Sequence, residues 1–133
     1  MTDQSENLYI DIDMKNIADI LDRMSAKARD MNLTGVSVAG IFDQSRTLLS
    51  QSRDCGKLFN GKWNYLAVAF SKISEMCETL GDSGSPLRKD IQGEFGYEGG
   101  TIKQVGDKFY VSAFSGARGE EDLVISKYGL EIV

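Results

Sequence analysis

The residues best suited to chemistry in this chain are charged and aromatic side chains of its middle and last thirds. Lys72 and Arg53 could pair with a carboxylate, and Trp63 and Tyr97 could line an apolar pocket. The glycine-rich stretch 93–100 allows backbone to approach another surface closely, but it lacks the lysine-serine pair of a phosphate-binding loop. These residues are candidates for a ligand pocket, and their spacing does not identify a reaction.

The chain contains no histidine. This excludes Ser-His-Asp and Cys-His catalysis, histidine zinc sites and histidine-ligated haem. Acid–base chemistry would have to depend on Asp, Glu, Lys, Tyr or Cys with shifted pKa values. The two cysteines form neither a disulfide framework nor a zinc site. We expect Cys77 on a buried helical stripe and Cys55 in a polar turn, where its thiol could be exposed.

Length and charge indicate a single domain over residues 1–133. A net charge of −5 argues against binding to nucleic acid or to anionic lipid. No apolar run approaches the roughly 20 residues that span a bilayer. The first residues are polar and acidic, unlike a signal peptide, so we expect residues 1–8 to be disordered and the protein to be cytoplasmic.

Hydrophobic periodicity predicts the elements of the first half. Residues 8–13 alternate briefly and are either a short edge strand or the entry to a helix, with Asp13 as a plausible N-cap. An amphipathic helix of about 18 residues should follow and end near Asn32. Residues 35–42 carry apolar side chains on both faces of a strand, and 47–53 form its hairpin partner. Arg53 and Asp54 should close that strand as a charged pair.

A second helix is expected from about Gly61, capped by Asn60 and ended by Gly81. Lys72 should lie at the edge of its apolar stripe, which comprises Trp63, Leu66, Ala67, Phe70, Ile73, Cys77 and Leu80. After a loop, residues 101–105 and 109–114 form a second hairpin. A last helix begins at three acidic residues, Glu120, Glu121 and Asp122, and ends at Gly129. Leu130 should then fold back on Ile125. The pattern predicts an α+β domain with an antiparallel sheet of about five strands flanked by helices.

Several of these motifs resemble the GlcG/HbpS family over roughly residues 12–130. Three similar features lie near the C-terminus: a strand that ends in Ser115-Gly116, an acidic helix start at Glu121-Asp122, and a helix-end glycine, Gly129. Three others lie earlier in the chain: the glycine pair Gly99-Gly100 before the last hairpin, the turn Arg53-Asp54 with Gly56, and an Ala-x-x-Lys step from Ala69 to Lys72 in the middle helix. Thr101-Ile102 stands where members commonly have Ile-Pro.

The resemblance implies a profilin-like fold, assembly into homo-oligomers, and binding of a small molecule or cofactor. Some members bind haem, in several with a histidine; here Tyr97, Cys55 or a methionine would have to act as axial ligand. Hydrophobic hairpin faces with Tyr110, Phe114 and Tyr97 give oligomerisation a physical reason. The implied site residues include Gly99, Gly100, Ser115 and Gly116.

Three functions are consistent with these patterns. The first is a ligand-binding accessory protein, whose pocket between the middle helix and the glycine-rich loop includes Trp63, Lys72, Arg53 and Tyr97. The second is an enzyme that uses Lys72 or Glu94 as acid–base group, with the Ser115-Gly116 helix mouth holding an oxyanion. The third is a structural subunit of an oligomer, without a working pocket.

Overall fold

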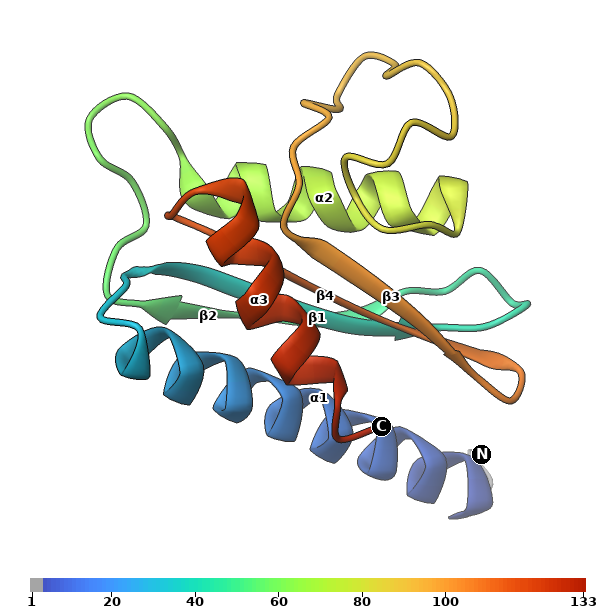
Figure 1. Ribbon diagram of the computed structural model, residues 1–133. Helices are drawn as coiled ribbons and strands as arrows, with labels where there is room; N and C mark the ends of the chain where they lie inside the picture. The colour runs from blue at the N-terminus through green and yellow to red at the C-terminus, as the bar shows by residue number, and fades with distance from the viewer. Residues whose placement is uncertain (1–3) are drawn as a thin grey trace.

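The computed structural model describes residues 4–133, which form three helices and four strands in the predicted order (Figure 1). The elements are α1 (Gln4–Asp30), β1 (Gly35–Phe42), β2 (Leu49–Cys55), α2 (Tyr65–Thr79), β3 (Gly100–Val105), β4 (Lys108–Ser115) and α3 (Gly119–Leu130). No helix among these residues has both the length and the apolar character that crossing a membrane requires.

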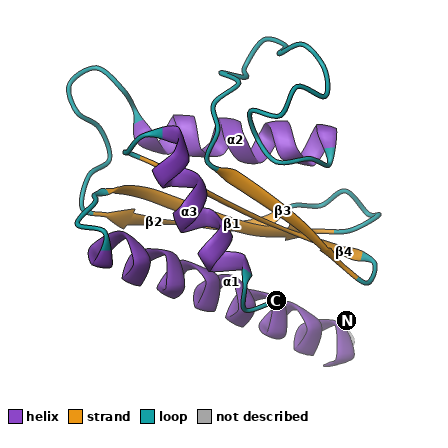
Figure 2. Ribbon diagram, in the orientation of Figure 1, coloured by secondary structure: helices purple, strands orange, loops and turns teal. Residues whose placement is uncertain are grey.

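The four strands make one antiparallel sheet in the order β2-β1-β4-β3, so the prediction of an antiparallel α+β domain is confirmed (Figure 2). The predicted number of about five strands is one too many. Strand β1 pairs with β2 on one side and β4 on the other, and all eight of its residues are buried. Its central place explains why its sequence is apolar on both faces.

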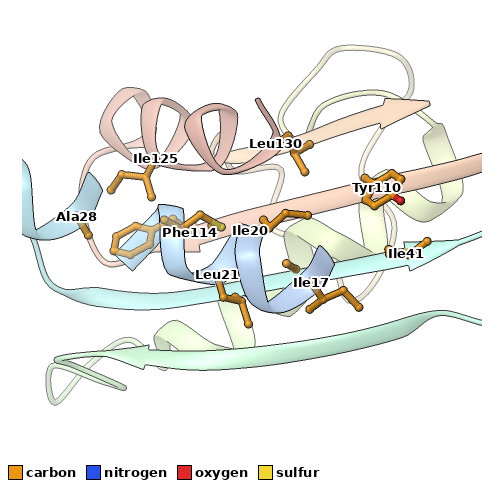
Figure 3. Close-up of a cluster of buried hydrophobic side chains, with 11 residues drawn as sticks. Ile17, Ile20, Leu21, Ala28, Ile41, Tyr110, Phe114, Ile125 and Leu130 are labelled. Carbon is orange, nitrogen blue, oxygen red and sulfur yellow. The ribbon is translucent and has the colours of Figure 1, made fainter. Parts of the chain in front are cut away.

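Helices cover both faces of the sheet, with α1 and α3 on one face and α2 on the other (Figure 1). Alternate residues of β4 therefore enter different cores: Tyr110 and Phe114 pack with α1 and α3, and Val111 and Ala113 pack with α2. Figure 3 shows the first core, where Phe114 lies between side chains of α1 and Ile125 of α3.

Helix α1 is longer than predicted. It begins at Gln4 and so includes residues 4–8, where disorder was expected, and residues 1–3 lie outside the described part of the chain. Residues 8–13 are helical as well, and the alternative of an edge strand is wrong. Asp13 lies inside the helix rather than at its N-cap, and its carboxylate accepts a hydrogen bond of 2.8 Å from Lys108 Nζ.

Helix α2 starts four residues later than predicted, and a different face of it is buried. Asn64 is its N-cap, because the Asn64 side chain accepts a hydrogen bond from the backbone N–H of Ala67. Trp63 consequently precedes the helix, and Phe70, predicted in the apolar stripe, is exposed. The buried residues of α2 are Val68, Ala69, Lys72, Ile73, Glu75 and Met76.

Helix α3 continues through Gly129 to Leu130, so the predicted glycine cap is wrong. Gly129 is required by packing instead, because a Cβ added there would lie 2.6 Å from Met24 Cγ of α1. The absence of a side chain lets the two helices approach closely. Leu130 joins Ile125 in the core between α1 and α3.

Candidate functional site

A buried ion pair joins α2 to the start of α3. Lys72 Nζ lies 3.0 Å from Asp122 Oδ2 and donates a second hydrogen bond of 2.7 Å to the Phe114 carbonyl of β4. The other carboxylate oxygen of Asp122 accepts a hydrogen bond from the backbone N–H of Ala117. The Lys72 and Asp122 side chains are only 2% and 5% exposed. Three elements therefore meet at one charged contact.

The ion pair explains the first glycine of the Gly99-Gly100 pair. The backbone of Gly99 has a φ of +127° and passes directly beside the two charged side chains. A Cβ there would lie 2.5 Å from Lys72 Nζ and 2.6 Å from Asp122 Cβ. Gly100 packs against Met76, and its N–H donates to Ser83 Oγ. The glycine pair thus lets β3 enter the sheet across the floor of the site.

Burial pushes both members of the pair towards their neutral forms. Desolvation raises the pKa of Asp122 to about 6, although Lys72 and the Ala117 N–H oppose the rise. Desolvation also lowers the pKa of Lys72, against the opposing effects of the Asp122 and Glu98 carboxylates. Two groups with such shifts beside a cavity are typical of functional sites, although structural ion pairs show them as well.

A cavity of about 290 Å³ lies directly above this ion pair. Five of the residues predicted for the site come together in its lining: Trp63, Lys72, Tyr97, Ser115 and Gly116. The remaining lining residues are Tyr65, Val68, Glu98, Ala117, Gly119 and Asp122. The cavity therefore lies where α2, the loop before β3 and the start of α3 meet.

Aromatic rings form the outer wall of this pocket. Trp63 and Tyr97 meet edge to face with ring centroids 6.1 Å apart, and Phe95 stacks on Tyr97 at 5.5 Å. Trp63 and Tyr97 are partly exposed, at 38% and 41%. Such rings at a pocket mouth can contact the apolar part of a ligand without any rearrangement of the core.

Two acidic residues of the site were missed by sequence reasoning. The sequence pattern places Asp122 in the acidic start of α3 and Glu98 in the glycine-rich stretch 93–100, and it predicts a place in the pocket for neither. Glu98 lines the pocket, and its Oε2 would lie 3.2 Å from a Cβ added at Gly119. Among residues 4–133, no hydrogen bond or ion pair to the Glu98 carboxylate is present. The usable signal was its position immediately before two glycines.

Arg53 and Asp54 lie elsewhere. Arg53 pairs with Asp22 of α1, on the sheet face opposite to α2. The Asp54 carboxylate accepts a hydrogen bond of 2.8 Å from the Gly56 N–H rather than pairing with its neighbour. Both residues line a separate cavity together with Cys55. The structure therefore does not bring Arg53 to Lys72, and the two cannot share one ligand carboxylate.

Glu94, the other acid–base candidate, is also outside the pocket. Its carboxylate is bound by both terminal nitrogens of Arg88 and by the Ile91 N–H, which lowers the pKa of Glu94 to about 2. Its oxygens lie within 4.8 Å of those of Glu75 and Asp90. This trio has the ligand type of a cation site, but Arg88 already neutralises Glu94 and the Gly84 N–H is bound to Glu75.

Solved structures of other proteins share this fold. The Klebsiella pneumoniae protein ORFY, described with the family model DUF336, aligns with a TM-score of 0.67 and 13% identity over 88% of this chain and 86% of its own. The PduOC:haem complex gives a TM-score of 0.59 at 12% identity, covering 90% of this chain and 92% of its own. HbpS gives 0.55 at 18% identity, with 90% and 87% covered.

No protein-family model and no curated protein sequence matches the chain. Identities of 12–18% establish a common architecture and leave ligand and activity open. The helix and strand order, the antiparallel sheet and the coverage of nearly the whole chain agree with the resemblance found in the sequence motifs. The chain thus has the fold of the DUF336 protein ORFY, HbpS and PduOC.

Proposed function

We propose that this protein binds a small organic molecule in the pocket above the Lys72–Asp122 ion pair. One observation supports the proposal most strongly: a cavity with aromatic walls lies directly on a buried charged pair that has a hydrogen-bonding site left. An ammonium group has three N–H donors, and Lys72 uses two of them within the described residues. The pocket thus combines apolar surface with a few oriented polar groups, as small-molecule sites do.

The PduOC structure is a haem complex, so we compare the pocket lining with the ligands that haem iron requires. The chain has no histidine, and the pocket lining contains no cysteine or methionine from the residues that the structure describes. Of the two tyrosines in the lining, the Tyr65 hydroxyl is bound to Asn60 Nδ2 at 2.8 Å, and the Tyr97 ring packs between Phe95 and Trp63. A cavity of about 290 Å³ is at the lower end for drug-sized ligands. These residues do not fit haem, and we propose a smaller ligand.

The proposal can be tested through Trp63, which is the only tryptophan of the chain and lies in the pocket wall. A library of small organic molecules is screened by thermal shift, and each hit is titrated against Trp63 fluorescence. We expect Tyr97→Ala to weaken a true pocket ligand about tenfold or more, by removing one aromatic wall. Phe59→Ala is the matched control, because Phe59 is an exposed ring outside the pocket lining. Equal effects of the two variants would contradict the proposal.

Self-association is a further proposal, on a different surface from the one the sequence suggested. Tyr110 and Phe114 are buried in the core and cannot form an interface. One group of exposed apolar side chains lies instead beside α2, where Phe70, Leu48 and Ile91 line a second cavity. Sedimentation of the wild type and of Phe70→Asp tests this, and identical masses at every concentration would exclude a role for that face.

A further inference from the structure

We infer that the ligand of this pocket is a small organic amine, with a positively charged nitrogen and an apolar or aromatic body. This inference rests on the proposed function and specifies the charge of the ligand. It replaces the carboxylate ligand expected when Arg53 was placed beside Lys72. Three properties of the lining support it: the net charge, the available acceptor at Glu98 and the aromatic wall.

The charge of the lining is negative. Within the described part of the chain, only three charged residues border the cavity, namely Lys72, Glu98 and Asp122, so two carboxylates face one ammonium. Lys72 is already compensated by Asp122 at 3.0 Å. The second carboxylate, that of Glu98, forms no ion pair among residues 4–133. An anionic ligand would meet this carboxylate at short range, and a cationic ligand would neutralise it.

Glu98 is placed to receive an ammonium group. Its side chain reaches the start of α3, and it lies close enough to Lys72 for the Glu98 carboxylate to oppose the burial-driven fall in the pKa of Lys72. An ionised carboxylate accepts hydrogen bonds and donates none. A ligand N–H would therefore find an acceptor at Glu98 inside the pocket. A ligand carboxylate could accept hydrogen bonds from the third N–H of Lys72 and from the Ser115 hydroxyl, but it would lie beside the negative charge of Glu98.

The aromatic wall favours the same ligand class. Trp63, Tyr65 and Tyr97 line the cavity, and indole and phenol rings attract cations through their faces. Lys62 Nζ lies 5.5 Å from the centre of the Trp63 ring, so this ring already has a cation near it. Lys62 borders the neighbouring cavity and not this pocket. The pocket therefore offers a carboxylate and aromatic rings together, the combination that recognises organic ammonium groups.

Three probes that share a phenylethyl body and differ in the charge of the polar end test the inference: phenethylamine, 2-phenylethanol and 3-phenylpropanoate. Each is titrated against the full chain, with Trp63 fluorescence as the readout of pocket binding. We expect phenethylamine to bind about tenfold more tightly than 3-phenylpropanoate, with 2-phenylethanol between them. Glu98→Gln keeps the shape of the side chain and removes its charge. This variant should weaken phenethylamine about five- to tenfold and leave 2-phenylethanol unchanged.

Glu78→Gln is the matched control, because it removes the same charge from an exposed residue of α2 outside the pocket. It should leave the preference for the amine intact. If 3-phenylpropanoate binds as tightly as phenethylamine, or if Glu98→Gln preserves the preference, the inference is wrong while the pocket still binds ligand. If no probe of any charge changes Trp63 fluorescence, the inference is contradicted, and the library screen decides whether the pocket binds a different small molecule.

Discussion

Lys72 of α2 and Asp122 of α3 are 50 residues apart in the chain, yet their charged groups lie 3.0 Å from one another in the interior. The contact joins the two helices across the end of β4 and forms the floor of the pocket. Removing one partner of a buried pair leaves an uncompensated charge, which is more costly than loss of an exposed pair.

Asp122→Ala should destabilise the protein by about 3 kcal/mol at neutral pH, because it removes the hydrogen-bond acceptors of Lys72 and of the Ala117 N–H in a desolvated site. Urea unfolding measures the change. Asp19→Ala is the control, since Asp19 pairs with Lys15 on the exposed side of α1 and its loss should cost under about 0.5 kcal/mol. The double variant Lys72→Met/Asp122→Leu should recover much of the lost stability. Equal, small losses for both single variants would show that the buried pair does not hold the fold together.

Stability should depend on pH through Asp122. Its pKa is about 6 in the folded protein, above the ordinary value of 3.8. The stabilising contribution is therefore complete below pH 3.8 and is lost as the pH rises through 6, by about 1–3 kcal/mol. The difference in unfolding free energy between wild type and Asp122→Ala, measured from pH 3.5 to 7.5, should fall over this window, because the alanine variant has no group that titrates there. A difference that does not change with pH would contradict the raised pKa.

Gly99→Ala should cost at least about 2 kcal/mol, because the new Cβ meets Lys72 Nζ at 2.5 Å and the backbone has a φ of +127°. Gly93→Ala separates the two causes, since Gly93 has a φ of +96° and open space around its Cβ position. Only backbone strain applies there, and about 1 kcal/mol is expected. Thermal or urea unfolding measures the stability of both variants. Equal losses of stability would show that the ion pair exerts no steric demand on Gly99.

Glu94→Gln should loosen the loop between α2 and β3. The Glu94 carboxylate binds Arg88 and the Ile91 N–H, and these contacts depend on its negative charge. Hydrogen exchange of residues 85–95 should become faster, while exchange in α1 stays the same. The contribution of Glu94 is present above pH 4.5 and is lost as the pH falls towards 2. Unchanged exchange in the loop would mean that the Arg88 contact does not order it.

The elements that could be predicted are those whose pattern is local. The two hairpins and the start of α3 follow from alternation, turn residues and acidic first-turn residues, and the structure confirms them. Gly129 was misinterpreted because its role is set by Met24 of α1, a contact between residues distant in the chain. The extent of α1 was also missed, since residues 4–12 carry no helical apolar stripe.

The buried face of α2 could not be predicted for a physical reason. Lys72 and Glu75 are charged, and periodicity assigns charged residues to the solvent side. Their burial is possible only because Asp122 and the Gly84 N–H satisfy them, and neither partnership is visible in the local sequence. Arg53 was misplaced for a similar reason: strand alternation does not reveal which sheet face carries α1 until the pairing with Ser37 is known.

The most direct test of the pocket is an NMR titration of the full chain with phenethylamine, followed by backbone N–H signals and the indole N–H of Trp63. We predict that the largest shifts occur at Trp63, Glu98, Gly116 and Ala117, which border the cavity. Signals of Arg53 and Cys55, on the opposite side of the sheet, should not move. Saturating shifts at Arg53 and Cys55, or no shifts at all, would contradict a binding site above the Lys72–Asp122 pair.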